Sequence, residues 1–258
     1  MKKSFFLILL LLCLYSSTKA QYSTLNVHSH NDYQQKNPFY EAYSHHFGSI
    51  EADIWEVNGV LLVAHEKDQI NPKKTLDAMY IQPIVRLFHQ NRGKVWNDYS
   101  GSFQLLIELK SDAAKTLKLV IDLLQKYPEV FDRSINQNAV MVTITGNCPS
   151  PDLFATYPGF IHFDGKLNLK YDEPQRSRIA LFSDDLEQFT SWKGIGNIPA
   201  NEQKKLQHVI DSVHALNHKI RFWNAPDNPN AWQTLMNLNV DYINTDHIQQ
   251  MDDFLHHK

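Results

Sequence analysis

The feature that most constrains the fold is a regular alternation of short apolar runs with amphipathic stretches. Eight runs are brief and rich in Val, Ile, Leu and Phe, the composition of strands buried on both faces of a parallel sheet. We expect these strands at residues 25–29, 49–54, 103–109, 139–144, 159–163, 178–182, 219–223 and 241–244. Helical periodicity is clearest at residues 75–90, 113–127 and 202–216. The alternation predicts an α/β protein built as a single (β/α)8 TIM barrel.

Two regions depart from a plain alternation. After the second strand, Val57-Asn58-Gly59-Val60 contains an Asn-Gly pair, which adopts the positive φ angles of a type I′ turn at low cost. This turn predicts a small β-ribbon inserted between the second strand and the second helix. Between residues 146 and 200 the pattern is weakest, because Pro and Gly recur and no long helix is evident before residue 202.

The first twenty residues have the pattern of a cleaved secretory signal. Lys2 and Lys3 precede an apolar run at residues 5–14, and small residues follow at Thr18-Lys19-Ala20. We therefore divide the chain into a signal peptide, 1–20, and a barrel domain, 21–258, and expect a periplasmic or extracellular location. A retained N-terminal anchor is the alternative. No second apolar segment is long enough to span a membrane.

Composition excludes some classes of partner. The 25 basic and 28 acidic residues give a formal net charge of −3, and no basic run provides the clustered charge that nucleic acid requires. Signal cleavage removes Cys13 and leaves Cys148 alone, so an internal disulfide is impossible and stability depends on a sizeable core. Nothing in the sequence sets an oligomeric state.

Acidic residues are placed unusually for buried strands. Glu51 and Asp53 are two apart on the second strand, so they point to the same face, and Glu108 ends the next barrel strand with Lys110 close behind. Adjacent carboxylates repel one another unless a cation or protons lie between them, and oxygen ligands suit one hard divalent cation, Ca²⁺ or Mg²⁺, better than zinc. The alternative is that one of the acids pairs with a Lys or Arg.

Polar residues also follow other strands of the expected barrel. The first strand leads into His28-Ser29-His30-Asn31-Asp32-Tyr33, and His65 ends the apolar run of the ribbon, where it is either a site residue or an ordinary edge residue. Trp223 and Asp246 follow late strands. Trp223 is expected to line a pocket or to belong to the core, and Asp246 to bind a hydroxyl group or to cap the last helix.

These motifs, in this order and spacing, resemble the glycerophosphodiester phosphodiesterase and phosphatidylinositol-phospholipase-C-like superfamily. The segments His28–Tyr33, Ile50–Trp55 and Leu61–His65 are most similar to a subgroup whose fungal members are called altered inheritance of mitochondria protein 6. The resemblance implies a metal-dependent phosphoric diester hydrolase acting on a small-molecule or lipid-headgroup diester. It further implies a cation held by Glu51, Asp53 and Glu108, proton transfer by His28 and His65, and a phosphate contact from Lys110.

One departure affects the expected substrate. Better-known relatives have His-Arg-Gly at the first strand, whereas here His28 is followed by Ser29 and His30. The arginine that helps to hold the phosphate in those relatives is missing, so their substrate preference does not transfer. His30 is a candidate for part of that role, and Asn31 either supports the metal or phosphate or serves as a turn residue.

Two other functions fit part of the pattern. An amidohydrolase-like metal hydrolase also uses His-x-His after its first strand, as in His28-Ser29-His30, with Asp246 at its last position. That class would leave Glu51, Asp53 and Glu108 without a role. The second alternative is a non-catalytic barrel that only binds a phosphorylated headgroup or a glycan.

Overall fold

The computed structural model describes residues 22–256, so the expected signal peptide lies outside the described residues. Eight parallel strands form a nearly closed barrel, which confirms the predicted fold. Neighbouring strands in the sheet follow the order β8-β7-β6-β5-β4-β2-β1-β9, and a bridge between Arg221 and Tyr242 links the two ends. The strands are β1 (Val27–Ser29), β2 (Ser49–Val57), β4 (Gln104–Leu109), β5 (Met141–Gly146), β6 (Ile161–Gly165), β7 (Ile179–Asp185), β8 (Lys219–Trp223) and β9 (Ile243–Thr245).

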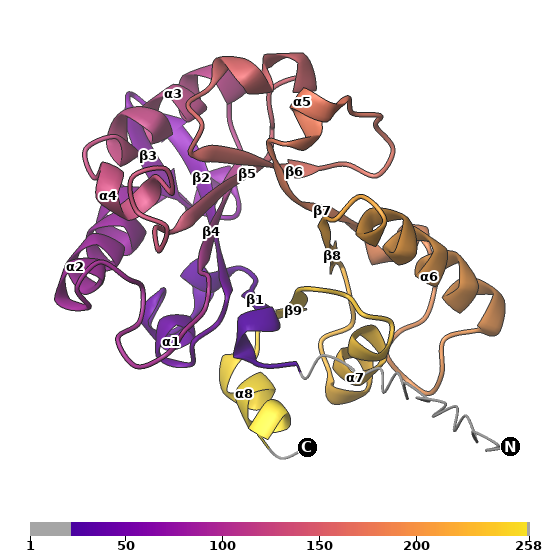
Figure 1. Ribbon diagram of the computed structural model, residues 1–258. Helices are drawn as coiled ribbons and strands as arrows, with labels where there is room; N and C mark the ends of the chain where they lie inside the picture. Colours follow the sequence, from indigo (N-terminus) through magenta and orange to yellow (C-terminus); the bar gives the residue numbers. More distant parts are fainter. Residues whose placement is uncertain (1–21, 257–258) are drawn as a thin grey trace, which may run out of the picture.

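Helices surround the barrel on the outside (Figure 1). They are α1 (Tyr40–Ser44), α2 (Gln82–Gln90), α3 (Ala113–Leu124), α4 (Pro128–Phe131), α5 (Glu173–Arg176), α6 (Ala200–His214), α7 (Pro229–Asn237) and α8 (Ile248–His256). Short 3-10 helices lie at Thr24–Asn26, Asp32–Gln34, Lys67–Gln69, Pro151–Thr156 and Leu186–Gln188. Within residues 22–256, no helix has the length and apolar character needed to cross a membrane.

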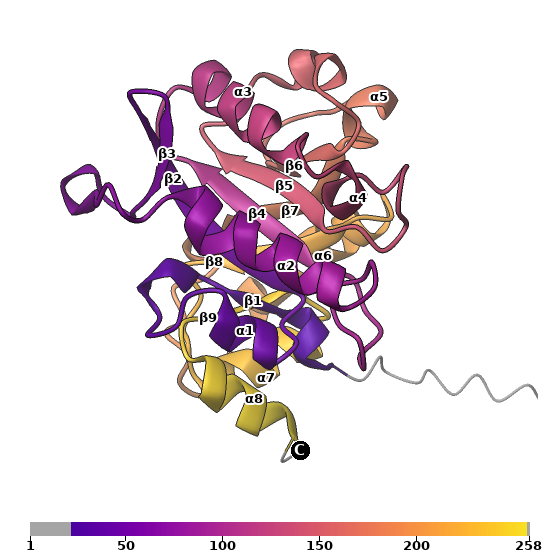
Figure 2. The same ribbon diagram turned by 90° about the vertical axis from the view of Figure 1, so that its left-hand side faces the viewer.

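The predicted ribbon is present. β3 (Val60–Val63) pairs antiparallel with the end of β2, and Asn58 and Gly59 have φ angles of 51° and 83°, as a type I′ turn requires. The resulting hairpin projects from the barrel (Figure 2). The helix predicted at 75–90 differs in detail, because a π-helical turn at Asp77–Ile81 precedes α2. The region from 146 to 200 contains only short helical elements beside β6 and β7.

The interior of the barrel is mostly polar. The main apolar core lies between the strands and the helices, whereas Leu106, Leu181 and Tyr242 form a small separate cluster. A chain of buried hydrogen bonds joins four other side chains: Thr143 donates to Gln104 (3.0 Å), Gln104 donates to Ser49 (3.0 Å), and Ser49 Oγ lies 2.7 Å from His28 Nδ1. Because buried polar groups must be satisfied internally, this chain fixes the orientation of the His28 ring.

A buried carboxylate organises the loop that follows β1. Asp32 is fully buried and accepts hydrogen bonds from the Phe39 backbone N–H (2.6 Å), Tyr80 Oη (2.9 Å) and Ser29 Oγ (2.9 Å). Phe39 has φ 66° and ψ −54°, and Tyr40 N–H bonds to Pro38 O across it at 2.8 Å, which makes a γ-turn. Such a conformation is costly for a bulky residue, so the Asp32 contact is what holds the turn.

The ionisation of Asp32 yields a prediction about stability. Burial raises the pKa of Asp32 to about 6 from 3.8, so the folded state binds this proton more tightly than the unfolded state. The contribution of this proton to the free energy of unfolding is fully present below pH 3.8 and is lost as the pH rises through 6. The difference of about two units between the folded and unfolded pKa values corresponds to about 3 kcal/mol in the free energy of unfolding.

In Asp32→Asn the amide can keep all three hydrogen bonds, since Ser29 can reverse its role. We expect chemical denaturation to show that Asp32→Asn is folded. The free energy of unfolding of the variant minus that of wild type should be about 3 kcal/mol larger at pH 7 than at pH 4. Asp32→Ala, which leaves the Phe39 N–H and Tyr80 hydroxyl unpaired, should lose about 2–5 kcal/mol at neutral pH. Identical pH dependence in wild type and Asp32→Asn would contradict this assignment.

Candidate active site

A cavity of about 510 Å³ opens at the carboxyl ends of the strands, where barrel proteins assemble their sites. The wall of this cavity is formed by the barrel strands from β2 to β8, by the end of the ribbon and by the loop after β1. The lining residues are His30, Asn31, Glu51, His65, Glu108, Lys110, Thr145, Gly146, Cys148, Asp164, Gly165, Lys166, Ser183, Arg221, Trp223 and Asn224.

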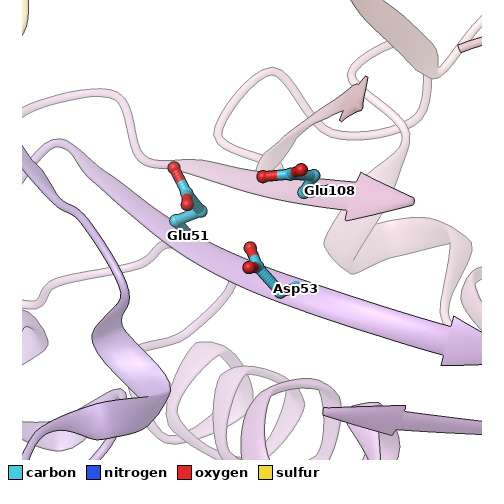
Figure 3. A group of neighbouring side chains, drawn as sticks. All are labelled: Glu51, Asp53 and Glu108. Atoms are coloured by element: carbon cyan, nitrogen blue, oxygen red, sulfur yellow. The ribbon is translucent and has the colours of Figure 1, made fainter. Parts of the chain in front are cut away.

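The three predicted carboxylates lie close together: Glu51 and Glu108 line this cavity, and Asp53 is buried beside them. Parallel pairing of β2 with β4 places Asp53 beside Glu108, and Glu51 precedes Asp53 by two residues on the same face. One carboxylate oxygen from each lies within 4.8 Å of those of the other two. Figure 3 shows the three groups turned toward one another.

Charge is not balanced within this cluster. Lys110 Nζ lies 2.8 Å from Glu108 and 3.0 Å from Asp53, and Arg221 Nη1 lies 2.9 Å from Glu51. The alternative of pairing with Lys or Arg is therefore partly realised. Three carboxylates against two cations still leave one net negative charge.

Asp53 carries the clearest sign of this imbalance. Its Oδ2 atom accepts from Tyr33 Oη (2.7 Å) and pairs with Lys110, whereas the buried Oδ1 atom has no hydrogen-bond partner. Burial, followed by the charges of Glu51 and Glu108, raises the pKa of Asp53 to about 6. An unpartnered carboxylate oxygen in an all-oxygen cluster fits a hard divalent cation.

Glu51 is held in its ionised form by its neighbours. Burial opposes its ionisation, but the hydrogen bond to His28 and the charge of Arg221 outweigh that effect and hold the pKa of Glu51 below its ordinary value. It is therefore a carboxylate over the whole physiological range, as a metal ligand must be.

The two predicted histidines flank the carboxylates from opposite sides. His28 Nε2 lies 2.8 Å from Glu51 Oε2, and His65 Nδ1 lies 3.1 Å from Asp53 Oδ2. His28 has no exposed surface, and burial together with the Arg221 charge lowers its pKa to about 4. The His65 side chain is 41% exposed and lines the cavity. One imidazole is thus neutral and enclosed, and the other is accessible.

The remaining predicted residues are only partly brought together. Lys110, His30, Asn31 and Trp223 line the cavity, and Trp223 is 39% exposed at its wall, so it is not a core residue. Asp246 does not line the cavity. It pairs with His30 Nδ1 at 2.9 Å, and although burial opposes protonation, this bond raises the pKa of His30.

Tyr33 and Arg221 also belong to the site, although the sequence motifs gave neither of them a role. Tyr33 Oη lies within hydrogen-bonding distance of Asp53, of Asn31 Oδ1 (2.6 Å) and of His65 Nδ1 (3.1 Å), so it joins the β1 loop to the cluster. Arg221 lies inside the barrel with its side chain 4% exposed. Its position two residues before Trp223 on the same strand was the available signal, because alternation places both side chains on one face.

The amidohydrolase-like alternative finds little support in this geometry. Within residues 22–256, the three carboxylates form the one group of three or more potential ligands close enough to share an ion. His28 and His30 do not form part of such a group, and His30 is directed toward Asp246.

The barrel and its acidic cluster define a (β/α)8 protein with a carboxylate site at the carboxyl ends of its strands. The sequence profile described as AIM6-like phosphodiesterase domain matches residues 17–156, more than half of the chain, so the chain belongs to this family. A profile of the glycerophosphoryl diester phosphodiesterase family also matches residues 219–249. Both matches agree with the resemblance seen in the motifs.

Individual relatives agree with this assignment. Altered inheritance of mitochondria protein 6 from Eremothecium gossypii is 28% identical over 267 residues, covering 88% of this chain and 69% of the relative. The protein of the same name from Saccharomyces cerevisiae is 28% identical, covering 86% and 68%.

Solved structures share the fold at low sequence identity. A glycerophosphodiester phosphodiesterase from Parabacteroides distasonis has a TM-score of 0.57 at 12% identity, covering 90% of this chain and 97% of that one. An Oleispira antarctica phosphodiesterase in complex with the product sn-glycerol-3-phosphate has a TM-score of 0.57 at 11% identity, covering 90% and 96%.

A glycine beside the cluster provides a test of its geometry. Gly146 has φ +74°, and a Cβ atom there would lie 2.6 Å from Glu108 Cγ and 2.8 Å from Leu109 O. Gly146→Ala should therefore displace Glu108, and we expect calorimetric titration with Ca²⁺ or Mg²⁺ to show an affinity reduced by about tenfold or more.

Gly59→Ala is the matched control, because Gly59 also has a positive φ, 83°, but nothing within 4 Å of the added Cβ. Both variants should lose about 1–2 kcal/mol from backbone strain. Equal cation affinity in the two variants would show that the Glu108 position does not matter to the ion.

Proposed function

We propose that this protein is an exported, metal-dependent phosphoric diester hydrolase for a glycerophosphodiester or a phospholipid-headgroup diester. The observation that carries the proposal is the acidic cluster of Glu51, Asp53 and Glu108 with an imidazole on each side of it. Family membership supports the reaction class. The small-molecule substrate is supported by the product named in the Oleispira phosphodiesterase complex. Export rests on the N-terminal sequence pattern.

Glu51, Asp53 and Glu108 would hold one divalent cation, Ca²⁺ or Mg²⁺. When bound, the ion supplies positive charge that offsets the negative charge developing on the phosphoryl oxygens. The unpartnered Oδ1 atom of Asp53 and the uncompensated charge of the cluster support this assignment. Lys110 lies at the edge of the cluster, where its ammonium group can also contact a phosphate oxygen.

His65 is suited to the role of general acid. An N–H at Nδ1 can be donated to Asp53, which orients the ring and leaves Nε2 to hold the second proton of the imidazolium. Its exposure allows that proton to reach the leaving oxygen of a bound diester.

His28 is suited to the role of general base. Its lowered pKa keeps it neutral, and in the tautomer that donates Nδ1–H to Ser49 the Nε2 lone pair is directed toward the cluster. The base takes its proton from water or from a substrate hydroxyl next to the ester. In the second case the first product is a cyclic phosphate.

A hydrolysis screen with site variants tests the proposal. We expect wild type to cleave at least one of a panel of glycerophosphodiesters, phosphatidylinositol and sphingolipid headgroup diesters, with the loss of the diester followed by ³¹P NMR. His28→Ala and Glu51→Ala should each reduce turnover by about 100-fold or more, the usual contribution of a proton-transfer group or a metal ligand.

His208→Ala is the control, since His208 is exposed on α6 away from the cavity, and its activity should equal that of wild type. Near-wild-type turnover in either His28→Ala or Glu51→Ala would contradict the proposed roles. A folded, cation-loaded wild type that cleaves no diester would instead indicate the non-catalytic binding barrel.

The lowered pKa of His28 also predicts the pH dependence. A general base is active when deprotonated, and a pKa of about 4 keeps His28 deprotonated as the pH falls from 7 to 5. At saturating cation, kcat/KM should therefore not fall over this range. A loss of half the activity near the ordinary histidine pKa of about 6.5 would exclude His28 as the base.

A further inference from the structure

We propose that Arg221, on β8, binds the phosphate of the substrate and supplies the guanidinium that relatives place directly after the first-strand histidine. The inference rests on the proposed function, because it names a ligand for the phosphoryl group of that reaction. It assigns to the late strand β8 a role that the first strand of this chain does not fill.

The residue after His28 is committed to another task. Ser29 has no exposed surface, and its hydroxyl donates to Asp32 Oδ1 at 2.9 Å. Asp32 in turn holds the γ-turn at Phe39, so Ser29 serves the loop after β1 rather than the cavity. Any guanidinium that contacts the phosphate of a bound diester must therefore come from another strand.

Arg221 lies where a phosphate bound to the acidic cluster would be. Its Nη1 atom is 2.9 Å from Glu51 Oε2, an oxygen of a proposed cation ligand, and the side chain lines the cavity. A phosphate oxygen that shares the ion with Glu51 would thus lie within reach of the guanidinium. A planar guanidinium can hold two phosphate oxygens at once, which a lysine ammonium cannot.

The donors of Arg221 are not fully used by the protein. Nε is buried without a hydrogen-bond partner, and Nη2 has only long contacts, 3.5 Å to Ser183 Oγ and 3.8 Å to Asp164 Oδ2. Asp164 instead takes its close hydrogen bonds from the Ser183 and Thr145 hydroxyls. A buried guanidinium with spare donors beside a cavity is suited to an anionic ligand.

The contacts of Nη1 also conflict with one another. Arg221 Nη1, His28 Nε2 and Glu51 Oε2 form a triangle with sides of 2.6, 2.8 and 2.9 Å. If His28 carries its proton on Nε2, that N–H faces the Arg221 N–H. If the proton is on Nδ1, the Nε2 lone pair faces the Glu51 carboxylate. One contact is therefore unfavourable in either tautomer, and an anion that draws Arg221 away from His28 removes the first of these two conflicts.

The other cations of the cavity are less suited to this role. Lys110 already lies between Asp53 and Glu108, and Lys166 is exposed to solvent. Arg221 is therefore the buried cation with donors to spare for the phosphate.

The test measures phosphate binding separately from turnover. Calorimetric titration of the full-length protein with sn-glycerol 3-phosphate, at saturating Mg²⁺, should show affinity reduced about 10- to 100-fold in Arg221→Met, the value of one or two charge-assisted hydrogen bonds. Arg221→Lys should fall between Arg221→Met and wild type. Mg²⁺ affinity, titrated alone, should stay equal or increase in Arg221→Met, because the guanidinium no longer competes for Glu51.

Arg133→Met is the matched control. Arg133 is also partly buried and donates to Ala139 O at 3.0 Å, but it lies before β5, at the other end of the barrel. Its loss should change stability while leaving phosphate affinity within about twofold. A loss of phosphate affinity in Arg133→Met as large as in Arg221→Met would contradict the proposal, because it would show a general effect of destabilisation.

The outcomes separate this inference from the proposed function. If wild type cleaves diesters and Arg221→Met binds the phosphate as tightly as wild type, Arg221 is only a counter-ion and the inference fails alone. If wild type neither cleaves diesters nor binds the phosphate, both proposals fail. Should Arg221→Met not fold, Arg221→Lys decides, and a phosphate affinity equal to that of wild type contradicts the proposal.

Discussion

The repulsion among three carboxylates on two adjacent strands is the constraint on which the rest of the site depends. Parallel pairing of β2 and β4 holds Asp53 beside Glu108, and alternation adds Glu51 on the same face. The surrounding groups oppose this repulsion: Lys110 pairs with two of the acids, and Arg221 and His28 contact the third. One carboxylate oxygen nevertheless stays unpartnered, which is why the site suits a cation.

In the barrel around this site, polar side chains fill most of the interior, and apolar side chains pack between the strands and the outer helices. Thr143, Gln104 and Ser49 form a buried hydrogen-bond chain that ends at His28, so the imidazole is held by the interior of the barrel rather than by a mobile loop. Asp32 has the equivalent function for the loop after β1, which brings Tyr33 to Asp53. The face of the barrel that carries the cavity is therefore fixed by buried polar contacts, whereas the helices outside contribute to the main apolar core.

Local patterns in the sequence predicted the elements well, because strand alternation and the Asn58-Gly59 turn act over a few residues. The position of Glu51 and Asp53 on one face was predictable for the same reason, because residues two apart on a strand point to the same side. Arg221 was not, because its significance depends on meeting Glu51, 170 residues away in sequence. The pairing of Asp246 with His30, 216 residues earlier, was unpredictable for the same reason.

The central claim is that Glu51, Asp53 and Glu108 together hold a single divalent cation. Anomalous diffraction from crystals soaked in Mn²⁺, which has oxygen-ligand preferences similar to those of Mg²⁺, tests it most directly. The account predicts one strong anomalous peak within about 2.5 Å of an oxygen from each of the three carboxylates. A peak bound instead by His28, His30 and Asp246, a pair of transition-metal peaks, or no peak between the carboxylates at saturating Mn²⁺ would contradict it.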